Sequence, residues 1–208
     1  GTGTVGDISA DYFGQFYHLM RHYLGGDCVP VLWNAPCAQI NNNDYSGKTK
    51  WPSRGYPQAK RMANVLAGHM VTEIQLMDMQ DELALNAATA NLDVTRRAIT
   101  DEDLHIAEQV LAGDYEYEEG PFSWVVGQPI PEDRVATYAR HCQRLAELPE
   151  QMTVPLQALR IGDAGIIALP GEIFVESGFR INAETSASPF MPVCLANDSN
   201  GYICTDEA

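Results

Sequence analysis

Two apolar runs in the last third of the chain end in polar groups, and they constrain the fold more than any other feature. The first run, 164–169, ends in Pro170 and Gly171, and the acid Glu172 follows directly. About one helix later the second run, 192–195, ends in a polar loop that carries Tyr202. This order predicts that a carboxylate and a phenol meet at the ends of neighbouring strands. Two such oxygen groups can bind a hard or borderline metal ion.

The composition is that of an ordinary globular protein. The chain has 208 residues, of which 45% are hydrophobic and 20% charged, and this length allows one substantial core. No apolar run approaches the ~18 residues that cross a bilayer, so we expect no transmembrane segment. The first residues show no basic start and no apolar stretch of a signal peptide. Localisation stays open, because the natural N-terminus is expected to lie upstream.

The charge excludes one class of partner. The net charge is −15, so no basic patch is expected that would neutralise nucleic-acid phosphates. The same charge disfavours tight binding to anionic lipid headgroups, and solubility is its expected use. The five cysteines have no C-x-x-C spacing, which is unlike a disulfide framework or a zinc knuckle, and one or two disulfides stay open as an alternative.

Periodicity and breakers predict an alternation of helices and strands. Gly25-Gly26 is predicted to end the first helix. Thr100 and Asp103 have the spacing of a capping box, and Gly162-Asp163 between two apolar runs predicts a hairpin. The aromatic, acidic and Pro/Gly-rich stretch 114–131 is expected to be an exposed excursion. We expect helices over 12–23, 57–70, 100–111, 132–147 and 173–182, and strands over 28–33, 85–99, 154–160, 164–169 and 192–195.

These elements predict an α/β (or α+β) fold with a mixed, largely buried β-sheet flanked by helices. No repeat, low-complexity tract or linker divides the sequence. We therefore interpret residues 1–208 as a single domain.

The two motifs at Glu172 and Tyr202, with the upstream Leu159–Asp163 segment, resemble the zinc-dependent neutral/alkaline (non-lysosomal) ceramidase family. Here the matching segments are Leu169-Pro170-Gly171-Glu172 and Leu195-Ala196-Asn197 with Gly201-Tyr202. The resemblance implies that Glu172 and Tyr202 are zinc ligands and that zinc is the cofactor. The alternative for Glu172 is helix capping, since a carboxylate in a first helical turn is favourable.

A second part of the chain resembles the family's nucleophile loop. Residues 34–43 read Asn-Ala-Pro-Cys-Ala-Gln-Ile-Asn-Asn-Asn, and Asn41 stands where ceramidases have a nucleophilic serine. Ser9-Ala10-Asp11-Tyr12 resembles the segment that precedes this loop in the family. The resemblance is strongest over residues 7–43 and 153–206.

This loop departs from the family pattern in ways that bear on mechanism. A carboxamide cannot accept an acyl group as a hydroxyl can, so Asn41 argues against the serine mechanism of the family. Ala35 and Ala38 replace glycines, and Gln39 replaces an aspartate. Asn41 and Gln39 are therefore candidate catalytic residues that orient substrate through their amides, while a metal-activated water attacks. Asn34 and Cys37 are candidate substrate-binding residues; Cys37 as nucleophile is an alternative that needs electropositive partners.

The resemblance also implies an incomplete metal site in this sequence. The family takes two further histidine ligands from an N-terminal part, so we expect this chain to be about the C-terminal half of a larger catalytic domain, with the missing N-terminal part as its partner. His18 and His22 have i, i+4 spacing, but they lack the intervening glutamate of a strong metal motif. We interpret them as exposed or half-buried residues of an aromatic helix.

The sequence thus favours a zinc-dependent hydrolase of the neutral/alkaline ceramidase type that cleaves an amide (N-acyl) bond of a small-molecule or lipid substrate. The alternative is a non-catalytic member with a degraded site that binds a ligand or a partner. The changes at Ala35, Ala38, Gln39 and Asn41 favour this alternative, and the retained Glu172 and Tyr202 oppose it.

Overall fold

The computed structural model describes residues 8–42, 44, 46–48, 50, 55–118, 121–125 and 130–205. Contacts divide the chain into two compact units, one of Gly1–Ala90 with Pro155–Ala208 and one of Asn91–Val154. The single domain remains a prediction. Helices together with a mixed four-stranded sheet confirm the α/β or α+β class.

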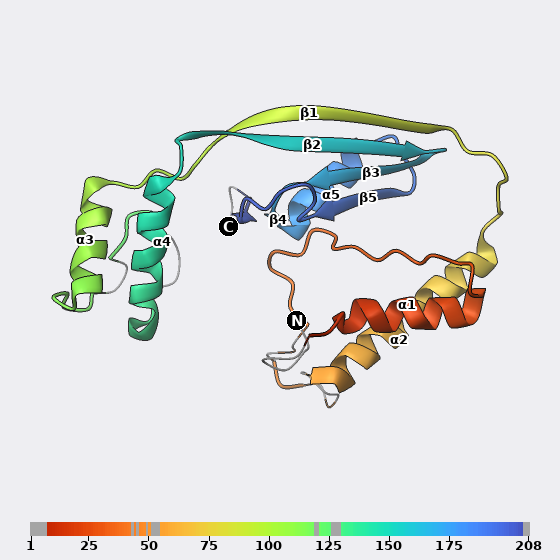
Figure 1. The fold of residues 1–208 in the computed structure, drawn as a ribbon, viewed down its shortest axis with the longest axis horizontal. Coiled ribbons are helices and arrows are strands. Elements are labelled where there is room, and N and C mark those ends of the chain that lie inside the picture. The colour runs from red at the N-terminus through yellow and green to blue at the C-terminus, as the bar shows by residue number, and fades with distance from the viewer. Residues whose placement is uncertain are drawn as a thin grey trace. The chain divides into compact units, whose positions relative to one another are not determined.

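The first unit begins with a pair of packed helices, α1 (Asp11–Leu24) and α2 (Gly55–Leu76), which lie side by side in Figure 1. Phe16 and Met20 of α1 pack against Ala63 and Ala67 of α2. The small alanine side chains let the larger residues of α1 fill the interface. Gly25 ends α1 with a φ of 97°, as the glycine pair predicts.

The four-stranded sheet has the strand order β1-β2-β3-β5. Its strands are β1 (Leu85–Thr95), β2 (Gln151–Ile161), β3 (Ala164–Leu169) and β5 (Phe190–Cys194). β2 and β3 form the predicted antiparallel hairpin, in which Gly162 takes a φ of 59°. β3 and β5 are parallel, with Leu169 opposite Cys194. The carboxyl ends of β3 and β5 therefore lie next to each other, at the same end of the sheet (Figure 1).

Helix α5 (Val175–Glu184) connects these two parallel strands. Leu169, Ile173 and Cys194 are buried, and Ile181 of α5 packs against them. Two short strands, β4 (Glu172–Ile173) and β6 (Tyr202–Ile203), form a separate parallel pair directly after β3 and β5. Because Glu172 and Ile173 belong to β4, the helix begins two residues later than predicted.

The second unit is built around α3 (Asp101–Ala112), the short 3₁₀ helix η1 (Glu132–Arg134) and α4 (Val135–Glu147). The predicted capping box is present: Thr100 and Asp103 bond each other's backbone N–H groups. The core of this unit consists of Ala107, Phe122, Ile130, Val135, Ala139 and Cys142.

Two predictions about local structure were wrong. Residues 28–33 form no strand, and Val29 and Val31 are 76% and 62% exposed. Pro30 lacks the N–H that a central strand needs, which explains why apolar composition misled the prediction. In the stretch 114–131, Phe122 and Ile130 are each only 1% exposed, so this part packs into the second unit rather than standing out from it.

The five cysteines are all free thiols. Among the described residues, no helix combines the length and the apolarity needed to cross a membrane.

Candidate functional site

Glu172 and Tyr202 are direct partners in the β4–β6 pair. The Glu172 N–H donates to the Gly201 carbonyl at 2.8 Å, and the Phe174 N–H donates to the Ile203 carbonyl at 3.2 Å. Glu172 is half-buried, whereas Tyr202 is 67% exposed. The backbone register thus brings together the two residues that the sequence singled out.

The side chains of this pair also meet. The Tyr202 phenol donates a hydrogen bond to the Glu172 carboxylate, and this bond together with the carboxylate's charge raises the pKa of Tyr202. A phenol and a carboxylate in contact present two oxygen atoms to the same small volume. Such oxygen donors suit zinc as well as harder ions.

The Pro-Gly sequence explains why the pair forms at this point. Pro170 has no N–H to continue a ladder, and its carbonyl accepts bonds from the backbone N–H and the side-chain amide of Asn200, both at 2.9 Å. A Cβ on Gly171 would lie 3.0 Å from the Gly201 carbonyl oxygen. Glycine therefore allows the Tyr202 segment to approach closely. Sequence reasoning did not assign Asn200 this role, although Asn200 directly precedes the matched Gly201-Tyr202 segment.

The loop that carries the other candidate residues lies along the same edge. The Cys194 N–H donates to the Asn34 carbonyl at 2.8 Å, and the Ala38 N–H donates to the Ile173 carbonyl at 3.1 Å. A turn follows, with the Ile40 N–H bonded to the Cys37 carbonyl at 2.9 Å. These bonds attach the loop to the ends of β5 and β4, next to Glu172.

Cys37 lies within electrostatic range of Glu172. Burial first, and the Glu172 carboxylate second, raise the pKa of the Cys37 thiol. A raised pKa disfavours the thiolate, which is the nucleophilic form. The surroundings of Cys37 therefore disfavour nucleophilic attack by its sulfur.

Gln39 is engaged by helix α5 through both ends of its carboxamide. Its Oε1 accepts from the Val175 N–H at 3.0 Å, and its Nε2 donates to the Glu176 carboxylate. Asn41 is exposed beyond this anchor, and Asn43 lies outside the described residues. The structure thus brings Glu172, Tyr202 and Cys37 together and gives Gln39 a contact with α5.

A buried glutamine that the sequence analysis passed over supports the end of this loop. Gln58 of α2 is 2% exposed, and its Nε2 donates to the Asn42 carbonyl at 2.9 Å. Pro36 packs on Gly178 of α5, where an added Cβ would come within 2.6 Å of the proline ring. No pattern in the sequence marks Gln58, because a helix position with a polar residue is normally solvated.

The residues present fit part of a zinc site. Glu172 and Tyr202 supply two oxygen ligands, while catalytic zinc usually takes three protein ligands and a water. In the described part of the chain, no group of three or more His, Cys, Asp and Glu side chains could hold a metal ion. His18 and His22 are exposed and make edge contacts with the rings of Tyr17 and Tyr23.

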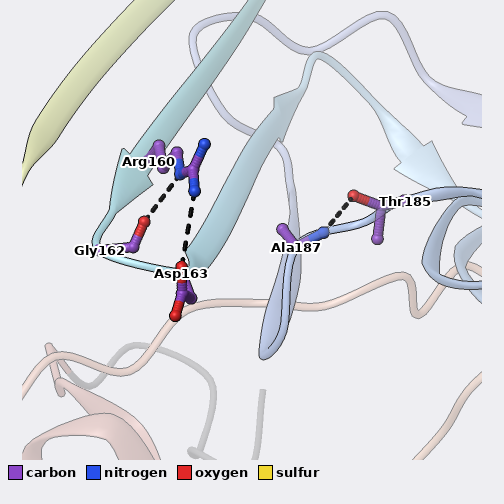
Figure 2. A network of polar contacts seen from close by, with 5 residues as sticks. All are labelled: Arg160, Gly162, Asp163, Thr185 and Ala187. Carbon is purple, nitrogen blue, oxygen red and sulfur yellow. Dashed lines mark hydrogen bonds and ion pairs between the residues drawn. The ribbon is translucent and has the colours of Figure 1, made fainter.

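A cavity of the first unit lies elsewhere. It measures about 490 Å³ and is lined by Arg160, Asp163 and Gly165 among others, at the amino end of β3. Figure 2 shows that Arg160 bonds the Gly162 carbonyl at 2.7 Å and pairs with Asp163 at 3.5 Å. The six residues of β3 span about 20 Å at about 3.3 Å per residue, so this cavity is remote from Glu172. Arg160 thus stabilises the hairpin turn.

A smaller apolar cavity adjoins the loop. It measures about 200 Å³ and is lined by Ala35 and Pro36 of the loop, Val175, Gly178 and Phe179 of α5, and Pro192 of β5, among others.

Two solved structures that share this fold are ceramidases. The chain superposes on a neutral ceramidase from Pseudomonas aeruginosa with a TM-score of 0.52 and 18% identity, over 95% of this chain and 35% of that one. It superposes on a ceramidase complexed with C2 with a TM-score of 0.53 and 17% identity, over 95% of this chain and 37% of that one. Neither a protein-family model nor a curated protein matches the sequence. The chain therefore has the fold of part of a ceramidase, and it spans about a third of the length of these structures.

Proposed function

We propose that this chain is part of a zinc-dependent hydrolase of the neutral ceramidase type that cleaves an amide (N-acyl) bond. The observation that carries the proposal is the pairing of Glu172 with Tyr202 in the β4–β6 register. The ceramidase fold supports the same reaction class.

Each candidate residue has a distinct role in this proposal. Glu172 and Tyr202 would hold zinc, and zinc would polarise a substrate carbonyl and make a nearby water a better nucleophile. Because Asn41 cannot accept an acyl group, water is the nucleophile. The amides of Asn41 and Asn34 orient the substrate by hydrogen bonding, and Cys37 contacts it from the loop.

An acyl group is the expected apolar part of the substrate. The cavity between the loop and α5 is lined mainly by carbon atoms of Ala35, Pro36, Val175 and Phe179, which suits an alkyl chain. A lipid amide such as a ceramide has this combination of an amide and alkyl chains.

Metal content tests the proposal. The longest natural form of the protein is purified with Glu172→Ala and Tyr202→Phe variants, and zinc is measured by plasma mass spectrometry. We expect about one zinc per chain in the parent protein and less in both variants, because each has lost an oxygen ligand. Glu73→Ala and Tyr23→Phe are matched controls on exposed helix positions, and they should keep the parent's zinc content. Absence of stoichiometric metal from the parent protein would refute the zinc mechanism.

The second candidate function is binding without catalysis. The engagement of Gln39 by Val175 and Glu176 favours it, because this carboxamide is committed to the helix rather than to a substrate. Zinc binding without release of fatty acid from N-acyl substrates would select this alternative. Zinc-dependent amide hydrolysis that is lost in Glu172→Ala would exclude it.

A further inference from the structure

The first turn of α5 depends on a residue far away in the sequence. Its N-cap residue, Phe174, has no side-chain group that can accept a hydrogen bond, and it makes no cap bond. The Val175 N–H is satisfied instead by the Gln39 side chain, 136 residues earlier in the chain. Gln39 therefore caps α5 from another segment.

The second end of the Gln39 carboxamide makes the contact specific. Its Nε2 donates to Glu176, the acidic residue in the first turn of α5. This position needs an acceptor toward Val175 and a donor toward Glu176, and a carboxamide supplies both. An aspartate or glutamate at residue 39 would supply only acceptors and would repel Glu176.

We propose that Gln39 is a positioning residue, which fixes the Asn34–Asn41 loop to α5 and so holds that loop beside Glu172. Glu172 belongs to β4 and lies only three residues before Val175, so a loop fixed to the first turn of α5 is also fixed relative to Glu172. The Ala38 N–H bond to the Ile173 carbonyl adds a backbone contact next to Gln39. The importance of this placement for substrate binding rests on the proposed function, whereas the placement itself does not.

Gln58 gives the loop a second anchor on its other side. Gln58 bonds the carbonyl of Asn42, the residue after Asn41. Ile40 and Asn41 therefore lie between Gln39, which is bonded to α5, and Asn42, which is bonded to Gln58. A segment held at both ends loses little further conformational freedom when it contacts a ligand. Such anchoring therefore lowers the entropy cost of binding.

Exchange of the two side chains tests the role of Gln39. The variants are Gln39→Glu, Glu176→Gln and the double exchange, with Gln39→Ala as a variant that removes the carboxamide without adding charge. The readout is amide hydrogen exchange resolved to single residues, in the full chain without metal or substrate. Val175 reports the cap and Ala38 reports the loop. Leu104 of α3, whose N–H bonds the Thr100 carbonyl, is the reference.

We expect exchange at Val175 and Ala38 to be roughly three- to tenfold faster in Gln39→Glu and Gln39→Ala, since a lost cap weakens its helix terminus by about that factor. The double exchange should restore the parent rates, because glutamate at 39 accepts and glutamine at 176 donates. Glu176→Gln alone should stay near the parent. Unchanged rates at Ala38 in Gln39→Ala, or a double exchange that does not recover, would overturn the proposal. Because no zinc is needed, this result is independent of the metal-content result.

Discussion

The carboxylate of Asp103 is the most completely satisfied charged group in the described part of the second unit, and its removal gives the sharpest stability prediction. Asp103 is 1% exposed. Its oxygens accept from the Thr100 N–H at 2.9 Å, the Thr100 hydroxyl at 2.6 Å, the Ser123 N–H at 2.7 Å and the Ser123 hydroxyl at 2.6 Å. One carboxylate thus joins the start of α3 to the segment at Ser123.

Asp103→Asn keeps the shape and removes the charge. The asparagine oxygen can stay on the Ser123 N–H, and its NH₂ group can donate to the two hydroxyls after they turn. The Thr100 N–H then faces a donor and loses its partner. A buried hydrogen bond to a charged group contributes about 1.5–3 kcal/mol, so we expect a loss of about 2–3 kcal/mol.

Urea denaturation measures the loss in the free energy of unfolding, and amide hydrogen exchange across α3 measures the local loss of stability. Asp101→Asn is the control, because Asp101 is an exposed acid in the same first turn. Its loss should be about 0.3–1 kcal/mol, the usual value for a charge beside a helix N-terminus. Equal losses in the two variants would refute the assignment of the stability to the buried hydrogen bonds.

The pH dependence gives a second check. Burial tends to raise the pKa of Asp103, but the bonds from Ser123 and Thr100 outweigh it and lower the pKa below its usual value. A lowered pKa in the folded state means stability that is present above the unfolded pKa of about 3.9 and is lost as pH falls through the folded value. The difference between parent and Asp103→Asn should therefore shrink in acid. A difference that stays constant from neutral pH to below pH ~3 would contradict the linkage.

Two further changes test packing beside the site with the same substitution. Gly178→Ala would place a Cβ within 2.6 Å of the Pro36 ring. The cost of overpacking, about 1–3 kcal/mol, should exceed the gain of about 1 kcal/mol from the higher helix propensity of alanine. The melting temperature should therefore fall. Gly68→Ala on α2 meets nothing within 4 Å, so there the gain of about 0.5–1 kcal/mol should raise the melting temperature. Differential scanning calorimetry reads both, and a melting temperature that rises in Gly178→Ala would show that Pro36 does not pack there as described.

Local signals in the sequence were sufficient for much of the fold. Thr100 and Asp103 predicted the start of α3, Gly25 predicted the end of α1, and Gly162 predicted the hairpin. Each depends on residues a few positions apart, where backbone geometry and short polar side chains decide the structure. The prediction of a strand at 28–33 was wrong because apolar composition alone does not supply strand partners, and Pro30 has no backbone N–H to donate.

For the candidate site, too, local motifs predicted some features and not others. The Pro-Gly-Glu and Gly-Tyr motifs identified Glu172 and Tyr202 and predicted that they meet at strand ends, and the β4–β6 register pairs them. Their function as zinc ligands stays a prediction. Sequence could not assign Gln39 to the cap of α5, because its partner lies 136 residues away.

What the sequence by itself determined is the set of elements, their local ends and the two motifs. Only the tertiary structure decided which polar groups those elements share: Ser123 joins the Thr100–Asp103 box, Gln58 bonds Asn42, and Gln39 caps α5. The physical reason is that a buried or helix-terminal polar group needs a partner in space, whatever its distance along the chain.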